Sequence, residues 1–134
     1  MNSEERWRQR FINFEYAFAV FDRRVDAYRK KSTDEANQMS LVQSYEIIIE
    51  LAWKTLKDYL QTQGYHEVRN GKQAIRQAFQ DNLISEPEVW MLALEIRNET
   101  SHTYNKVVLK KVLDFATERF HPILRDLNKQ LKQL

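Results

Sequence analysis

The sequence predicts a single all-α domain. Only two glycines and two prolines occur among 134 residues, and 43% of the residues are hydrophobic. Glu, Lys, Gln, Arg, Leu and Ala are abundant, and these residues favour helices. The length suits one domain over residues 1–134, with a core that needs no disulfide or metal.

Two long helices are expected in the first half of the chain. The first runs from about Glu4 to Lys31, and its apolar residues recur at steps of four and three, as in a helix that packs antiparallel against a neighbour in a bundle. This seam consists of Trp7, Phe11, Phe14, Phe18, Phe21, Val25 and Tyr28. The second helix follows a polar break of Ser32, Thr33 and Asp34, residue types that suit an N-cap, and runs from about Glu35 to Gln63, where Gly64 ends it. Its centre, around residues 47–53, is apolar on nearly all sides, which predicts a central position in the bundle.

Three further helices are expected in the second half. A short one covers about residues 72–82 and should bury Ile75, Ala78 and Phe79. A fourth should begin with a capping box of Ser85 and Glu88, with Pro87 in the first turn.

The fifth helix should be capped by Asn105 and kinked or restarted at Pro122. An apolar stripe then continues to the terminus, and it fits either the core or a dimer interface. This stripe comprises Ile123, Leu124, Leu127, Leu131 and Leu134.

Composition excludes several classes of protein. The chain has no cysteine, which excludes a disulfide scaffold, a thiolate zinc site and a cysteine nucleophile. It has no apolar run near the roughly 18 residues that cross a membrane, and Met1–Arg10 lacks the apolar centre of a signal peptide. We therefore expect a cytoplasmic protein. A net charge of only +2 means that any RNA contact would depend on a local basic patch.

The segment from Arg97 to Tyr104 is the densest cluster of reactive side chains. Helical spacing puts Asn98 and His102 on one face, whereas Arg97 and His102 are five apart, about 140° around a helix. These two would meet if the helix unwinds or if a second subunit supplies its copy. The histidine could then move a proton and the arginine bind a phosphate, as in metal-independent RNA cleavage. From the spacing alone, the commoner interpretation is an ordinary helix end.

Two glutamates interrupt the apolar centre of the second helix. Glu46 and Glu50 are four apart, so they share a face flanked by large apolar groups. A partly buried carboxylate needs a partner, and Arg97 is a candidate for it. The alternative is a narrow solvated stripe, with Glu50 paired to Lys54 on the surface, and the sequence favours neither.

The remaining polar features indicate no cofactor and no metal. Arg69, Lys72 and Arg76 form a basic row that could meet a phosphate or an acidic surface, although such rows are more often simply solvated. His66 and His121 lack neighbours at the spacing of metal ligands, and two glycines cannot form a phosphate-binding loop.

Several short segments occur in an order and spacing typical of one protein family. They are Arg6-Trp7-x-Gln9-Arg10-Phe11-x-Asn13-Phe14, Glu50-Leu51-Ala52-Trp53-Lys54-Thr55-Leu56-Lys57-Asp58-Tyr59-Leu60, Ile75-Arg76-Gln77-Ala78-Phe79, Leu83-Ile84, Trp90 and Arg97-Asn98-x-x-Ser101-His102-x-Tyr104. Together they resemble the nucleotidyltransferase substrate-binding proteins, a branch of the HEPN superfamily, over almost the whole chain.

The resemblance implies a fold and a set of partners. It implies an up-and-down bundle of about five helices, a homodimer in which two Arg–His motifs face a shared cleft, and a minimal nucleotidyltransferase encoded nearby. The chain lacks that enzyme's Gly-Ser and Asp-x-Asp elements, so it should not transfer nucleotides itself. In related toxin–antitoxin pairs the HEPN subunit is a ribonuclease whose catalytic residues correspond to Arg97 and His102. The partner neutralises it by attaching AMP to a tyrosine at the position of Tyr104.

Three functional interpretations follow. The first is a latent ribonuclease toxin, in which Arg97 holds the scissile phosphate, His102 is the general acid or base and Asn98 orients the site. The second is a non-catalytic module that binds a nucleotide or another substrate for the nucleotidyltransferase, or docks that enzyme. The third is a dimeric helical scaffold, for which changes at Arg97 and His102 would alter stability only.

Overall fold

The computed structural model describes all residues 1–134 and contains helices and no strand. Its elements are α1 (Ser3–Lys30), α2 (Glu35–Thr62), α3 (Gly71–Gln80), α4 (Pro87–Glu99), a 3-10 turn (Thr100–His102), α5 (Lys106–Asp114), a π-helical segment (Phe115–Phe120) and α6 (His121–Lys132). Helix α5, the π segment and α6 follow one another without a break, so they form one rod. The five rods confirm the predicted all-α bundle.

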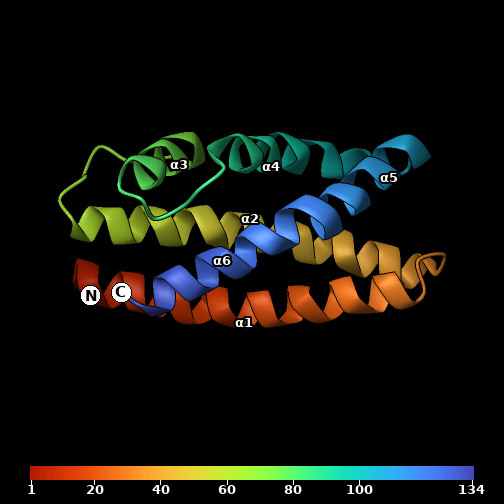
Figure 1. Ribbon diagram of the computed structural model, residues 1–134, viewed down its shortest axis with the longest axis horizontal. Helices are drawn as coiled ribbons and strands as arrows, with labels where there is room; N and C mark the ends of the chain where they lie inside the picture. Colours follow the sequence, from red (N-terminus) through yellow and green to blue (C-terminus); the bar gives the residue numbers. More distant parts are fainter.

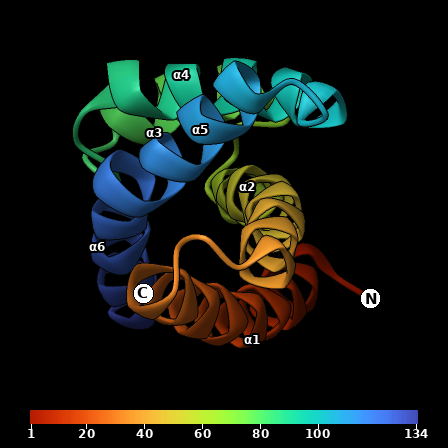
Figure 2. The same ribbon diagram turned by 90° about the vertical axis from the view of Figure 1, so that its right-hand side faces the viewer.

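The two long helices form an antiparallel hairpin that spans the molecule (Figure 1). Helices α3 and α4 lie end to end along α2, and the rod of α5 and α6 crosses from α4 back to α1 (Figure 1). Viewed along the long axis, the rods surround a common interior (Figure 2). The two termini lie at the same end, where the Arg8 guanidinium donates a hydrogen bond to the Leu134 carbonyl at 3.1 Å.

Local sequence signals set most helix ends. The carboxylate of Asp34 and the amide oxygen of Asn105 each accept two backbone N–H groups from the helix that follows, as predicted. Gly64 adopts a left-handed φ of 97°, and the next N–H, from Tyr65, bonds to the Leu60 carbonyl. This is the glycine-terminated helix end that the sequence predicted.

Burial confirms the predicted seam of α1. Its aromatic residues pack in the interior, with Phe14 and Phe21 completely buried and Phe18 and Tyr28 partly so. The C-terminal stripe also belongs to the core, since Leu124 and Leu131 are fully buried. The stripe is therefore not available as a dimer interface.

Three local predictions were wrong. Ser85 does not cap α4, because the helix begins after Glu86, which has a left-handed φ of 55° and makes no side-chain cap. Ile47 and Phe79 were expected inside the bundle, yet each is 48% exposed. Both lie on helices whose other apolar residues already fill the core, so these two side chains face outward.

The predicted interruption at Pro122 takes the form of the π segment. Within it the N–H of His121 bonds to the carbonyl five residues back, at Ala116. The same pattern would direct the N–H of residue 122 to the Thr117 carbonyl, but proline has no N–H. Arg29 of α1 supplies the missing donor, with its Nη2 2.7 Å from that carbonyl. This hydrogen bond links the π segment to α1.

No helix of the structure is both long enough and apolar enough to cross a membrane.

Candidate functional site

Arg97 lies at the C-terminal end of α4 and faces the middle of α2. Its Nη1 is 3.3 Å from the Glu46 carboxylate, and its Nε is 3.9 Å from Glu50. The predicted partnership of Arg97 with these two carboxylates is thus present. Glu50 also lies 3.9 Å from Lys54, so the surface pair considered as the alternative exists beside it.

Thr100 completes this cluster, and its role was not predicted from the sequence. Its hydroxyl oxygen accepts a hydrogen bond from Arg97 Nη1 at 3.0 Å. The hydroxyl proton can go to the Glu46 carboxylate at 2.9 Å or to the Arg97 carbonyl at 2.7 Å. Thr100 is buried, while the side chains of Arg97 and Glu46 are 35% and 33% exposed. The network therefore holds the guanidinium in place and leaves part of it open to solvent.

His102 and Tyr104 lie on the exposed surface after α4 ends. The helix tightens into the 3-10 turn at Thr100, and the turn carries His102 away from the direction of α4. His102 Nδ1 is 3.2 Å from the Tyr104 hydroxyl, and the two rings meet edge to face. Tyr104 is 82% exposed, which leaves its hydroxyl accessible.

Within one chain, Arg97 and His102 make no hydrogen bond with each other. Arg97 bonds to residues of α2 and to Thr100, whereas the only side-chain partner of His102 is Tyr104. Asn98 is exposed and makes no side-chain hydrogen bond to either residue. The α-helix ends between the two residues, at Glu99, but their side chains bond to different partners.

Two contacts brace the segment that carries the motif. The buried Tyr45 hydroxyl of α2 donates a hydrogen bond of 2.6 Å to the Ala93 carbonyl, one turn before Arg97. Burial raises the pKa of Tyr45, so this hydroxyl keeps its proton and remains a donor. On the other side of the motif, Lys111 of α5 pairs with Glu99 at 3.0 Å.

A second titratable cluster, which the sequence did not predict, lies on α6. His121 is buried and its Nε2 is 2.7 Å from Asp22 of α1, while Arg125 lies 3.4 Å from its Nδ1. Burial lowers the pKa of His121 although its Nε2–H donates a hydrogen bond to Asp22, and the nearby charge of Arg125 lowers the pKa further. Asp22 and His121 are 99 residues apart, so no local pattern could have indicated the pair.

A hollow of about 310 Å³ adjoins the Arg97 cluster. It lies between α2, the start of α3 and the end of α4, and its lining includes Glu50, Trp53, Lys72, Arg97 and Asn98. Of the predicted basic row, only Lys72 lines it. No group of three or more His, Asp or Glu side chains is arranged to hold a metal ion.

Comparison with known proteins agrees with this architecture. Residues 9–133 match the family described as nucleotidyltransferase substrate binding protein like. Among solved structures, the chain is similar to HI0074 from Haemophilus influenzae, described as having the fold of a substrate binding domain of a nucleotidyltransferase. The two share 22% identity and a TM-score of 0.83, over 92% of this chain and 99% of that one. No curated protein matches by sequence. The chain belongs to the family of nucleotidyltransferase substrate-binding-like proteins.

Proposed function

We propose that this chain is the cytoplasmic HEPN subunit of a two-component nucleotidyltransferase system, and that two copies of it form a metal-independent ribonuclease. The family to which the chain belongs, and the description of HI0074 as a substrate binding domain of a nucleotidyltransferase, support the partnership with such an enzyme. One observation carries the catalytic part. Arg97 is held firmly yet partly exposed, and the same segment presents an exposed His102.

The two side chains suit cleavage of RNA without a metal. The guanidinium of Arg97 would bind the scissile phosphate and stabilise the charge that develops on its oxygens. The 2′-hydroxyl would attack phosphorus as the bond to the 5′-oxygen breaks. The imidazole of His102 would take the proton of the hydroxyl or give one to the leaving oxygen.

A second copy would bring an arginine and a histidine to one site, since Arg97 and His102 of one chain bond to different partners and not to each other. In a symmetric dimer, His102 of one subunit would meet Arg97 of the other, and two equivalent sites would form. The surface beside the motif suits such contact, since Val107 is 79% exposed. Exposed apolar side chains can mark a surface that another protein covers.

Tyr104 would be the residue through which the partner enzyme silences the site. Its phenol oxygen would attack the α-phosphorus of ATP held by the nucleotidyltransferase, with release of pyrophosphate. His102 Nδ1, 3.2 Å from that oxygen, is placed to accept the phenol proton. The attached phosphate would add negative charge beside the motif and repel RNA.

A non-catalytic role is the second candidate, and one observation favours it. The charge of Arg97 is already matched by Glu46 and Glu50 within the same chain. In that role the surface around Arg97 would present a nucleotide to the partner enzyme or bind the enzyme itself, and no bond of RNA would break.

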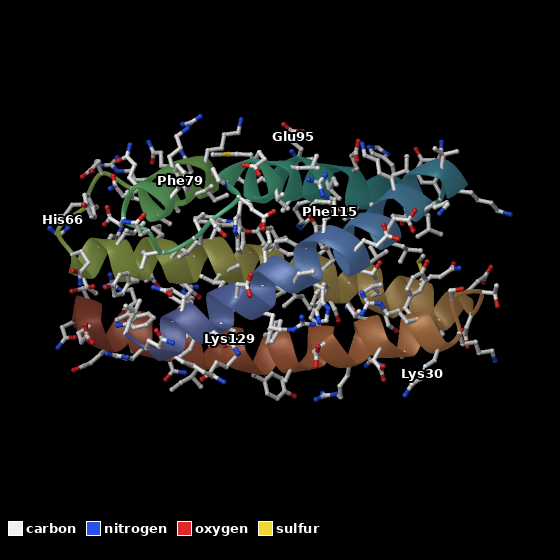
Figure 3. The ribbon with its side chains drawn as sticks, viewed as in Figure 1. Lys30, His66, Phe79, Glu95, Phe115 and Lys129 are labelled. Carbon is white, nitrogen blue, oxygen red and sulfur yellow. The ribbon has the colours of Figure 1, made fainter.

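The two candidates differ in the effect of His102→Ala. Purified, unmodified protein without its partner should cleave RNA and inhibit growth when expressed. His102→Ala should lower the cleavage rate by about 10² or more, the usual contribution of a general acid or base. His66→Ala is the matched control, since His66 is an exposed histidine on the loop after α2 (Figure 3). Wild-type protein that neither cleaves RNA nor inhibits growth would rule out the ribonuclease.

A further inference from the structure

The hollow beside Arg97 combines features that the ribonuclease chemistry does not use. Three segments far apart in the sequence build it: Glu50 and Trp53 of α2, Gly71 and Lys72 of α3, and Leu94, Arg97 and Asn98 of α4. Its volume of about 310 Å³ is at the lower end of small-ligand pockets, which range from about 300 to 1,000 Å³. The space therefore suits a ligand of the size of one nucleotide rather than a longer segment.

The two cationic side chains that line the hollow, Lys72 and Arg97, have hydrogen-bond donors without partners. Lys72 is exposed and lies within ion-pair distance of no carboxylate. Arg97 uses Nη1 for Glu46 and Thr100, but its Nε is buried without a hydrogen-bond partner, with Glu50 too far at 3.9 Å. The Nη2 of Arg97 makes no hydrogen bond and is not buried, so it is the donor that a phosphate oxygen in the hollow would reach. The start of α3 at Gly71 adds a positive partial charge near Lys72.

Trp53 supplies an aromatic wall to the hollow. Its indole is partly exposed, and the ammonium groups of Lys54 and Lys57 lie 5.7 and 6.0 Å from the ring centre. Gly71 lets α3 begin close to this ring, since a Cβ there would be 3.4 Å from the indole and 3.1 Å from Leu94. Aromatic rings beside cations are the usual platform for nucleobases.

We propose that this hollow binds one nucleotide unit, with its phosphate between Lys72 and Arg97 and its base against Trp53. Asn98, whose amide offers both donors and an acceptor, would bond to the base edge or the ribose. The inference rests on the proposed function and deepens it. The phosphate at Arg97 would connect the catalytic motif to a pocket that anchors the neighbouring nucleotide of the substrate.

Tryptophan fluorescence provides a direct test, because Trp7 and Trp90 are each only 1% exposed and Trp53 is the accessible indole. His102→Ala protein is titrated with AMP, with a short uridine oligoribonucleotide and with ribose 5-phosphate, and affinities are measured by calorimetry. AMP or the RNA should quench the fluorescence, whereas ribose 5-phosphate, which has no base, should not. If only the RNA binds, the pocket recognises a nucleotide within a polymer. If AMP binds as well, the pocket also accepts free nucleotides.

Two variants locate the binding. Lys72→Ala should weaken nucleotide affinity about tenfold, and Lys129→Ala, an exposed lysine on α6 (Figure 3), should not change it. Trp53→Phe should keep most of the affinity and lose the quenching, while Trp53→Ala should bind at least about tenfold more weakly if its circular dichroism shows that it folds.

The proposal would be overturned if Lys72→Ala bound nucleotides as tightly as the parent protein and Trp53→Phe still showed the quenching. It would also be overturned if no binding were seen at millimolar nucleotide. This outcome is distinct from failure of the ribonuclease. Protein that binds nucleotides in the predicted way but cleaves no RNA would keep the pocket and remove the catalytic proposal. Protein that cleaves RNA, but whose nucleotide affinity does not change when Lys72 or Trp53 is replaced, would keep the catalytic proposal and remove the pocket.

Discussion

Arg97 at the end of α4 forms an ion pair with Glu46 in the middle of α2, with 3.3 Å between Nη1 and the carboxylate. The pair joins two helices across 51 positions of the chain, and Thr100 bonds to both partners. A guanidinium held on two sides loses little freedom when it binds a phosphate. Thr100 would still hold the guanidinium without Glu46, whereas the Glu46 carboxylate also competes with a phosphate for it.

Replacement of Glu46 should separate its structural and functional effects. Glu46→Ala should lower the free energy of unfolding by about 1 kcal/mol, because an ion pair and a hydrogen bond at a half-exposed position are lost. The same change frees Arg97, so affinity for RNA should rise. Urea unfolding and RNA binding in the His102→Ala background measure the two effects.

Glu95 is the matched control for Glu46. It is an exposed glutamate of α4 that forms no ion pair and points away from the bundle (Figure 3). Glu95→Ala should change neither stability nor RNA affinity by a measurable amount. Weaker RNA binding by Glu46→Ala than by Glu95→Ala would show that the carboxylate does not compete with RNA for Arg97.

Tyr45 should matter through a single hydrogen bond. Tyr45→Phe removes the donor to the Ala93 carbonyl and leaves the ring in the core, so it should cost about 1 kcal/mol of unfolding free energy. Thermal unfolding measures this, with Tyr16→Phe as control since Tyr16 is 74% exposed. Equal melting temperatures for the two variants would mean that the bond to α4 adds nothing.

Patterns in neighbouring residues allowed the helices to be predicted from the sequence. Asp34, Asn105 and Gly64 act on backbone groups within one turn, so their roles can be read from the residue and its position. The link between Glu46 and Arg97 was one of two interpretations that the sequence left open, since a carboxylate among isoleucines needs a partner but could also lie on a solvated stripe. The predicted cap at Ser85 was wrong because Glu86, in a left-handed conformation, is the residue that precedes α4.

Features that depend on which helices meet could not be predicted. Ile47 and Ile48 are adjacent and chemically equivalent, yet one is 48% exposed and the other buried, since only the packing of the helices decides which of them is covered. The same holds for Trp53, whose contact with Gly71 depends on the placement of α3. His121 was assigned no partner because its partner, Asp22, lies on another helix.

The buried His121 should make stability depend on pH. Burial lowers its pKa in the folded protein, so below its ordinary value of about 6.5 the unfolded chain takes up a proton that the folded chain does not. The free energy of unfolding should therefore fall as the pH drops from about 6.5 towards the lowered pKa. Urea unfolding at several pH values in this range should show that the free energy of unfolding changes less steeply with pH in His121→Gln than in His66→Gln. Equal slopes would contradict this account.

Arg29 and Pro122 should be coupled in stability. Arg29→Met removes the donor that serves the Thr117 carbonyl and should cost about 1 kcal/mol. In Pro122→Ala the backbone N–H returns and can take over that role, so the same change should cost less. A double-mutant cycle from urea unfolding measures the coupling, and strictly additive effects would show that the arginine does not substitute for the missing N–H.

Mixed dimers test the shared site most directly. Arg97→Ala and His102→Ala proteins should each be inactive in RNA cleavage, while unfolding together and refolding as an equal mixture should restore about one quarter of wild-type activity. Half of the dimers are then mixed, and one of their two sites has an intact arginine from one subunit and an intact histidine from the other. A mixture no more active than either variant alone would show that the two residues do not act across a dimer.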